Sequence, residues 1–235
     1  MIVCPVCRTH NHHLAVVCSS CRSFIQTRIE NLDLFTTAWG IIEHPRKTFL
    51  TIALAKHKNY SLLLSAISGI GFIFTIFWII KAGNYADSLM NILSAGLCIG
   101  PLLGVIVVLV YSIIMKLVGR LFSARITFRN LFAMNAYALM PIVISVGLVL
   151  PIELLSFGRF FFSTNPSPLV IKPFSYIILL CLDGMLSIWT IILQFVGYKV
   201  LDDAQWLKII LINLLSFGIC IGIIAWALIT FVHPA

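Results

Sequence analysis

The sequence predicts an all-α integral membrane protein with five transmembrane helices and a small β-hairpin head at its N-terminus. Of its 235 residues, 60% are apolar and only 10% are charged, and the mean hydropathy is +1.06. Soluble domains do not tolerate so apolar a composition, because their surfaces must be solvated. Five long apolar runs follow Asn59, and two Cys-x-x-Cys pairs lie within the first 22 residues. The apolar runs predict the helices, and the cysteine pairs predict the head.

Each of the five apolar runs is long enough to cross a bilayer. A helix needs about 20 residues to span a hydrocarbon core of about 30 Å. Glycine and proline residues interrupt the runs, and transmembrane helices tolerate them where neighbouring helices satisfy the backbone. The predicted spans are residues 60–80, 92–115, 132–155, 174–195 and 209–232.

The positions of the basic residues predict the orientation of these spans. Thirteen of the 16 Lys and Arg residues precede the first span or lie in the connections that follow the second and fourth spans. Cytoplasmic segments of membrane proteins are rich in Lys and Arg, so we expect the N-terminus in the cytoplasm and the C-terminus outside. We expect no cleavable signal peptide, because the first 20 residues contain cysteine pairs in place of an apolar segment.

The formal charge of +8 does not require a nucleic-acid partner. Each Lys or Arg near a membrane surface gains about 1 kcal/mol from anionic headgroups. A nucleic-acid-binding protein would carry its basic face on a folded soluble domain, and no segment outside the spans is long enough to form one. We therefore expect the lipid bilayer as a partner, and no nucleic acid.

The four N-terminal cysteines, Cys4, Cys7, Cys18 and Cys21, have the spacing of a zinc ribbon. Two residues between the members of a pair allow one turn to present both sulfur atoms to an ion, and two facing turns complete a tetrahedron. The ten residues between the pairs suffice for a short hairpin with THNHH at its tip. Cytosolic thiols stay reduced, which favours a metal over disulfides. The sequence predicts one structural Zn²⁺ held by these four cysteines.

Other uses of the head have less support. A thioredoxin-type redox pair needs a single Cys-x-x-Cys on a βαβ frame, which is missing here. His10, His12 or His13 could replace a cysteine, but four thiolates already complete a structural site. A catalytic zinc needs an open coordination position with acids or bases nearby, and none is evident.

Arg8 and Arg22 directly follow the second cysteine of each pair. Turns of this kind usually carry glycine at that position, where φ is positive. Two explanations stay open for the arginines. Either their guanidinium groups offset the net charge of about −2 on a four-thiolate zinc site, or both side chains are simply solvated.

Residues 27–59 connect the head to the first span, and their pattern predicts two amphipathic helices. Apolar residues recur there at three- and four-residue spacing, which forms one stripe of a helix; they are Leu32, Phe35, Trp39 and Ile42. Pro45 favours the first turn of the second helix. The stripe lies either along the cytoplasmic membrane interface or against the helical bundle. The chain then divides into a zinc ribbon (1–26), an interfacial linker (27–59) and a membrane domain (60–235).

Three segments of the chain carry a family resemblance. They are EHPRKTF before the first span, ARITFRNLFAMNAYALMP leading into the third, and IWTIILQFVGYKVLDDAQWLKIILINLL from the fourth to the fifth. Together they resemble the YIP (Ypt-interacting protein) domain, over roughly residues 34–232. The resemblance implies five spans with a cytoplasmic N-terminus. Eukaryotic members are associated with Rab-type GTPases and vesicle traffic, whereas bacterial members have no agreed biochemical role.

The head also bears on the source and location of the protein. A ribbon fused to this domain, without a long Gly/Pro/Gln-rich N-terminal region, looks like a bacterial member of the family. The resemblance therefore implies a protein of the bacterial cytoplasmic membrane. It carries no argument for Rab binding, because a family likeness alone does not establish a partner.

Asp183 is the one acid well inside a predicted span. A charge at this depth costs about 2.5–3.5 kcal/mol, so an intramembrane acid is a functional-site candidate by default. Alternatively, Asp183 is protonated or hydrogen-bonded to a polar residue of a neighbouring helix and fixes helix packing. The candidate polar site consists of Asp183, Asn135, Tyr137 and Asn213. Glu153 lies nearer the outer end of its span, where we expect it in the interface near Arg159.

The sequence favours a non-enzymatic protein. The motifs of serine hydrolases, zinc proteases and phosphate-binding loops are missing. The leading interpretation is a YIP-like membrane protein that organises membrane or protein partners through a cytoplasmic zinc-ribbon docking module. The alternative is a small transporter, channel or lipid-moving protein that uses the polar site around Asp183. We expect the partner to be a cytoplasmic or membrane protein, which the sequence does not identify. The sequence is also compatible with an oligomer.

Overall fold

The computed structural model describes residues 2–27 and 29–232, with side chains as far as Ile223. The head contains two strands, β1 (Ile2–Val3) and β2 (His10–Asn11), which pair antiparallel around the first cysteine pair. The expected hairpin tip at THNHH is wrong, because this segment contains β2. The rest of the chain is helical. Its helices are α1 (Leu34–Glu43), α2 (Pro45–Leu54), α3 (Ser61–Ile79), η1 (Ala82–Asn84), α4 (Leu89–Leu121), α5 (Phe128–Ala138), α6 (Met140–Ile144), η2 (Ser145–Val149), α7 (Leu150–Phe157), η3 (Gly158–Phe162), α8 (Pro168–Ile171), α9 (Pro173–Asp202) and α10 (Trp206–Val232).

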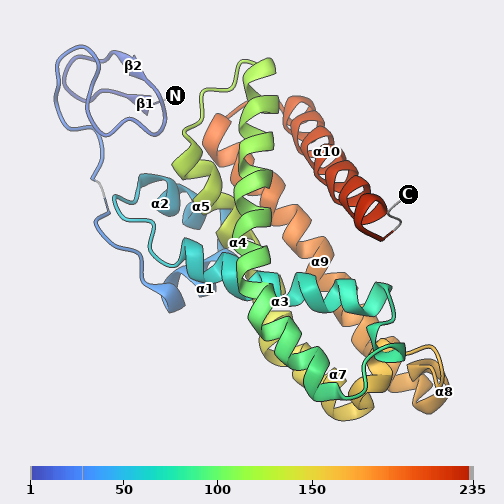
Figure 1. The fold of residues 1–235 in the computed structure, drawn as a ribbon. Coiled ribbons are helices and arrows are strands. Elements are labelled where there is room, and N and C mark those ends of the chain that lie inside the picture. The colour runs from blue at the N-terminus through green and yellow to red at the C-terminus, as the bar shows by residue number, and fades with distance from the viewer. Residues whose placement is uncertain (1, 28, 233–235) are drawn as a thin grey trace.

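Five helical segments of the described chain are long and apolar enough to cross a membrane. They are Ser61–Ile79, Leu89–Leu121, Met140–Phe162, Pro173–Asp202 and Trp206–Ile223. The predicted fold class, a five-helix membrane protein with a small hairpin head, is confirmed. The head, the α4–α5 connection and the α9–α10 turn lie toward one end of the bundle, and α8 lies at the other (Figure 1). The predicted outer location of the C-terminal tail concerns residues 233–235, which are outside the described part of the chain.

The third membrane-crossing segment is interrupted at its prolines. Pro141 and Pro151 lack the N–H that continues the ladder of a helix, and the chain changes its winding near each of them. A break at Leu139 separates α5 from α6, and η2, a π-helical stretch, directly precedes α7. The predicted span starts at residue 132, within α5. In the structure the second half of α5 is buried, and the long apolar helix begins at Met140.

The closest helix contact joins α3 to α4. A Cβ atom on Gly69 would lie 2.1 Å from the carbonyl oxygen of Gly100, and one on Gly104 would lie 2.1 Å from that of Ser65. No side chain larger than hydrogen fits at either position, because the two backbones touch there. Small residues in both helices therefore set the distance between α3 and α4.

The linker forms the two helices that its pattern predicts, but α1 buries a different face. Pro45 opens α2, whose Phe49 and Ile52 are buried against the bundle. In α1 the buried apolar residue is Ile41, whereas Phe35 is 82% exposed and Trp39 and Ile42 are also exposed. Ile41 joins the same core cluster as Phe49, so contact with α2 decides which side of α1 turns inward. The predicted stripe packs against the bundle only at Leu32, which precedes the helix.

Gly104→Val tests the contact between α3 and α4. We expect the free energy of unfolding in detergent micelles to fall by about 3 kcal/mol or more, because the added side chain meets backbone that cannot move aside. Thermal or denaturant unfolding followed by circular dichroism measures the change. Gly218→Val is the matched control, since nothing lies within 4 Å of a Cβ atom there. Equal stability of the two variants would contradict the prediction.

Candidate metal centre and polar sites

The two cysteine pairs form two turns of the same geometry. In the first turn, the N–H of Arg8 donates to the carbonyl of Cys4, and the N–H of Cys4 donates to that of Thr9, both at 3.0 Å. In the second turn, the corresponding bonds join Arg22 to Cys18 at 3.1 Å and Cys18 to Ser23 at 2.9 Å. These bonds hold each Cys-x-x-Cys in a tight loop that presents both sulfur atoms on one side.

The four sulfur atoms come together as a tetrahedral metal site requires. All four Sγ atoms lie within 4.8 Å of one another. Cys4 Sγ is 3.6 Å from Cys21 Sγ, and Cys7 Sγ is 3.5 Å from Cys18 Sγ. Four thiolates around one Zn²⁺ at about 2.3 Å would stand about 3.8 Å apart. The cluster therefore could hold a metal ion, and it fits a zinc-ribbon head.

Hydrogen bonds to sulfur prepare the first cysteine of each pair for metal binding. The backbone N–H of Cys7 and the hydroxyl of Ser23 lower the pKa of Cys4 to about 6. The backbone N–H of Cys21 likewise lowers the pKa of Cys18. Because the thiolate is the form that binds metal, both shifts favour coordination near neutral pH.

Arg8 and Arg22 adopt the backbone conformation that their positions predict. Both have a φ of 58°, in the left-handed region that usually carries glycine. Each arginine therefore tolerates a conformation that costs an L-residue about 1–2 kcal/mol. Both side chains are exposed, and the two explanations for their presence stay open.

Three polar residues around the cluster had no place in the sequence analysis. Ser23 Oγ lies 3.1 Å from Cys4 Sγ and 3.0 Å from Cys21 Sγ, and Thr9 Oγ1 lies 3.2 Å from Cys7 Sγ. Buried Asn11 donates to Cys18 Sγ at 3.5 Å. Outer groups of this kind orient metal ligands. The sequence could have predicted Thr9 and Ser23, because a hydroxyl residue stands two positions after the second cysteine of each pair.

The histidines of the hairpin are separate from the cysteine cluster. The metal-ligating group in the described part of the chain contains the four cysteines and no histidine. The rings of His12 and His13 lie 4.4 Å apart between centroids. Burial, together with the neighbouring charge of His13, lowers the pKa of His12.

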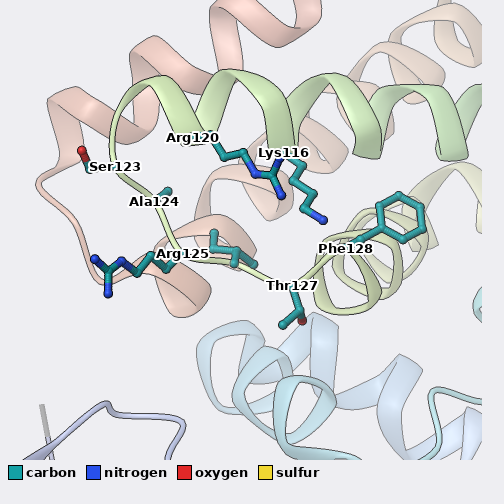
Figure 2. Close-up of a pocket in the computed structure, with 8 residues that line it drawn as sticks. Lys116, Arg120, Ser123, Ala124, Arg125, Thr127 and Phe128 are labelled. Carbon is teal, nitrogen blue, oxygen red and sulfur yellow. The ribbon is translucent and has the colours of Figure 1, made fainter.

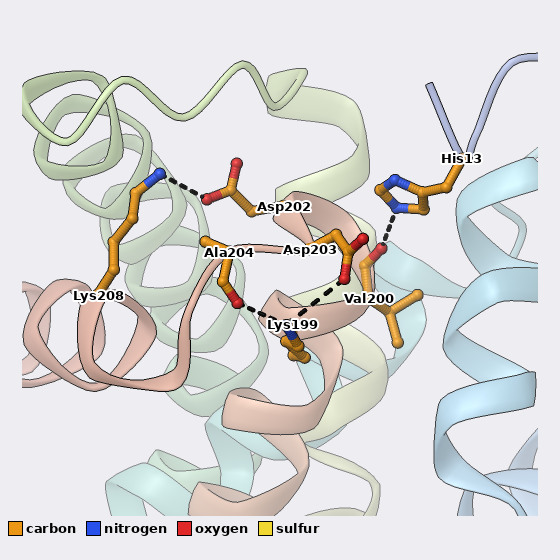
Figure 3. A network of polar contacts seen from close by, with 7 residues as sticks. All are labelled: His13, Lys199, Val200, Asp202, Asp203, Ala204 and Lys208. Carbon is orange, nitrogen blue, oxygen red and sulfur yellow. Dashed lines mark hydrogen bonds and ion pairs between the residues drawn. The ribbon is translucent and has the colours of Figure 1, made fainter. Parts of the chain in front are cut away.

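His13 instead connects the head to the membrane domain. Its Nε2 lies 2.6 Å from the carbonyl oxygen of Val200, near the end of α9 (Figure 3). A carbonyl oxygen only accepts, so Nε2 carries the proton of this hydrogen bond. Leu14 adds an apolar contact to the main core. The head is thus attached to a defined point on the bundle.

Ion pairs brace the turn to which His13 binds. Lys208 Nζ lies 3.0 Å from Asp202 Oδ2, and Lys199 Nζ lies 3.4 Å from Asp203 Oδ1 (Figure 3). Lys199 also donates to the carbonyl of Ala204 at 2.5 Å. These contacts join the end of α9 to the start of α10. They therefore hold the Val200 carbonyl in a fixed position for its hydrogen bond with the head.

The four residues of the predicted intramembrane site hydrogen-bond to partners outside that set. Asn135 donates to Ser112 Oγ at 2.9 Å, and Tyr137 donates to the carbonyl of Asn59 at 2.6 Å. Asn213 donates to the carbonyl of Ile209 in its own helix at 2.9 Å. The bonds of Asn135 and Tyr137 tie helices and connections to one another, as interhelical polar groups commonly do, whereas the bond of Asn213 stays within α10.

Asp183 has different neighbours, which sequence reasoning did not identify. Ser145 donates to Asp183 Oδ1 at 2.6 Å, and Glu153 lies close to Asp183. Glu153 is only 2% exposed, so it lies inside the bundle and the expected interfacial position is wrong. Ser145 begins the π-helical stretch η2, and such stretches are frequent at functional sites.

A model of the Yip1 domain matches residues 39–229 of the chain. The chain belongs to the Yip1 domain family. This confirms the resemblance seen in the three segments of the sequence. The matched region begins inside α1 and ends inside α10, so it contains all five of the long apolar segments found in the described chain. No curated protein and no solved structure shows a match to the chain.

The cysteine head precedes the matched Yip1 region, and its contact with that region is testable. His13→Ala removes the hydrogen bond to Val200, which we expect to speed amide exchange at the attached end of the head about fivefold, the equivalent of about 1 kcal/mol. Hydrogen–deuterium exchange read by mass spectrometry measures this effect. His10→Ala is the control, because the His10 side chain is exposed. The same exchange rate in both variants would show that His13 does not anchor the head.

Proposed function

We propose that this Yip1-domain protein is non-enzymatic and organises membrane or protein partners, with the head as a docking module that carries one structural Zn²⁺. The donor set supports zinc, because four soft thiolates with tetrahedral spacing favour it. The sequence supports a non-enzymatic role, since it lacks the motifs of the hydrolase and phosphotransfer classes. Zinc would fix the fold of the head, which has only two short strands of its own.

The distribution of basic residues supports a location for the head on the cytoplasmic side of the membrane. Thirteen of the 16 Lys and Arg residues lie before α3, around the α4–α5 connection or around the α9–α10 turn, which favours the cytoplasmic side of a bacterial cytoplasmic membrane for these parts. The proposed division is a head (1–26), a linker (27–59) and a membrane domain (60–235). The exposed aromatic side chains of α1, Phe35 and Trp39, suit the membrane interface, where such residues concentrate.

The observation that carries the docking role is the apolar surface of the head. Phe24 is 80% exposed and Val6 is 70% exposed, although both belong to a very small folded unit. Val17 pairs with Phe24 across the second turn and is exposed as well. Exposed apolar groups on a rigid surface mark sites of protein contact. The attachment of the head through His13 leaves these side chains accessible.

Three variants test the docking role and its dependence on metal. Cys7→Ser removes one ligand, so we expect loss of the zinc that elemental analysis finds in the intact protein, together with loss of docking. Phe24→Ser changes only an exposed side chain, so we expect zinc to be retained and docking to be lost. Cross-linking in native membranes, with a photoreactive residue at Val6, measures docking through the cross-linked protein bands.

Cys98→Ser is the matched control. Cys98 is an exposed cysteine in α4, away from the cluster, and its loss should leave zinc content and cross-linking unchanged. If Phe24→Ser keeps every cross-linked band of the intact protein, the docking role is wrong. If Cys7→Ser keeps the zinc, the metal assignment is wrong.

The contact of Glu153 with Asp183 favours a second candidate, transfer of protons or small cations across the membrane. Acidic pairs inside a bilayer are expensive and often mark ion pathways. Ser145 and Asp183 offer oxygen atoms in the same place, and one buried oxygen of Glu153, Oε1, has no hydrogen-bond partner. A cation or a transferred proton would satisfy that oxygen.

Reconstituted vesicles test this second candidate. With a proton or sodium gradient applied, we expect flux above that of empty vesicles and a loss of at least about tenfold in Asp183→Asn, which can no longer carry the charge. Asp87→Asn is the control, because it removes an exposed acid outside the long apolar helices. Flux that is no higher than in empty vesicles rejects transport.

A further inference from the structure

We infer that the cavity between the end of α4 and the start of α5 binds the phosphate group of an anionic phospholipid. This site is separate from the cysteine cluster and from the acids inside the bundle, and it does not rest on the docking role. It lies in the connection between the second and third membrane-crossing segments, where α4 leaves the bilayer.

The cavity has a volume of about 610 Å³ and is strongly basic. Lys116, Arg120 and Arg125 contribute three cations to its lining, and no acidic residue lines it. Lys116 and Arg120, one helical turn apart, point from α4 into the space beside α5, whereas Arg125 extends outward from the connection (Figure 2). Two cations one turn apart on a helix suit an anion between them.

The backbone adds to the positive potential of the cavity. Thr127 is the N-cap of α5, but its side chain accepts no capping hydrogen bond, so the first N–H groups of α5 are left for another acceptor. A helix N-terminus also carries about half a positive charge. The Ser123 and Thr127 hydroxyls, both exposed, complete a donor set that suits phosphate oxygens.

Among the described residues, the cations of the cavity have no protein counter-ion. Within the described residues, none of the three forms an ion pair with a carboxylate. Lys116 instead stands 6.0 Å from the centre of the Phe128 ring. Elsewhere at the same end of the molecule, Lys199 and Lys208 do pair with acids. The cavity therefore concentrates unpaired positive charge that an external anion would neutralise.

The surroundings of the cavity favour a lipid over a free phosphate ion. At 1.5 Å per residue, the 33 residues of α4 span about 50 Å, which exceeds the hydrocarbon core of about 30 Å. The last turns of α4 thus reach the headgroup region. Ile106, Ile113 and Leu117 are exposed along α4, and their spacing of seven and four residues forms one apolar stripe that leads to Lys116 and Arg120. An acyl chain fits this stripe when its phosphate lies in the cavity.

Lipid binding by the intact protein in nanodiscs tests the proposal. The discs contain phosphatidylcholine with a minor fraction of phosphatidylglycerol, and native mass spectrometry measures which lipid remains bound after release. We expect retained phosphatidylglycerol in the intact protein and about 30-fold weaker retention in K116Q/R120Q, which loses two cations. R46Q/K47Q is the matched control, because it removes two exposed cations from α2 and should bind as the intact protein does.

Three results would overturn the proposal. Equal retention in the intact protein and K116Q/R120Q, or an equal loss in both double variants, would show that the cavity has no special role. If inorganic phosphate displaces the lipid at a concentration close to the dissociation constant of the lipid, the cavity is a site for the free ion. If K116Q/R120Q does not elute as a folded protein, the single variant R120Q, at an exposed position, carries the same test with a smaller expected loss of about fivefold.

Discussion

The contact between the backbones of α3 and α4 is the constraint on which the rest of the bundle depends. Gly69 and Gly104 let the helices approach until main-chain atoms touch. Ser65 and Ser68 are buried beside this contact, and each donates to a carbonyl of its own helix, at 2.8 and 2.7 Å. The interface therefore holds no unsatisfied hydroxyl at these positions. In a bilayer the hydrophobic effect does not drive helices together, so such close contact between small residues supplies much of the association.

The position of α4 then determines where the other helices lie. Tyr111 of α4 donates to Gln194 of α9 at 3.2 Å, and Ser112 accepts from Asn135 of α5 at 2.9 Å. α10 also packs against α4. Because α4 contacts each of these elements, a shift of α4 away from α3 would move the cavity at its end and the α9–α10 turn that holds the head. Helix packing inside the membrane and the geometry of the basic end are thus coupled.

The sequence predicts those parts of the fold that depend on local pattern. The five apolar segments are visible because hydropathy is a property of each run by itself, and the cysteine cluster is visible because its ligands come in spaced pairs. The α3–α4 contact had a usable signal as well, since Gly96, Gly100 and Gly104 recur every four residues. The exposed face of α1 could not be derived, because contact with α2 decides it. The break at Leu139 could not be predicted from Pro141 alone, because the prediction also requires the burial of α5, which the sequence does not show.

The candidate sites show the same limit. Asp183 was identifiable by itself, but its contacts with Ser145 and Glu153 depend on how α9 packs against η2 and α7, and nothing in the sequence specifies that register. The contact of His13 with Val200 joins residues at opposite ends of the chain. Thr9 and Ser23 were within reach, because the repeated order of cysteine, arginine and hydroxyl residue is local. Sequence patterns thus predict the ligands of a site better than the partners that surround them.

The arginines of the head have a consequence for its place at the membrane. With the proposed zinc, four thiolates and one divalent ion carry a net charge of about −2. Arg8 and Arg22 are the only Lys, Arg, Asp or Glu residues between residues 2 and 26, and they bring the formal charge of the head to about zero. A head with two negative charges would be repelled by an anionic lipid surface, within a Debye length of about 8 Å. A neutral head would be able to stay beside the basic end of the bundle with lipid phosphates bound there, which favours the first of the two explanations for the arginines.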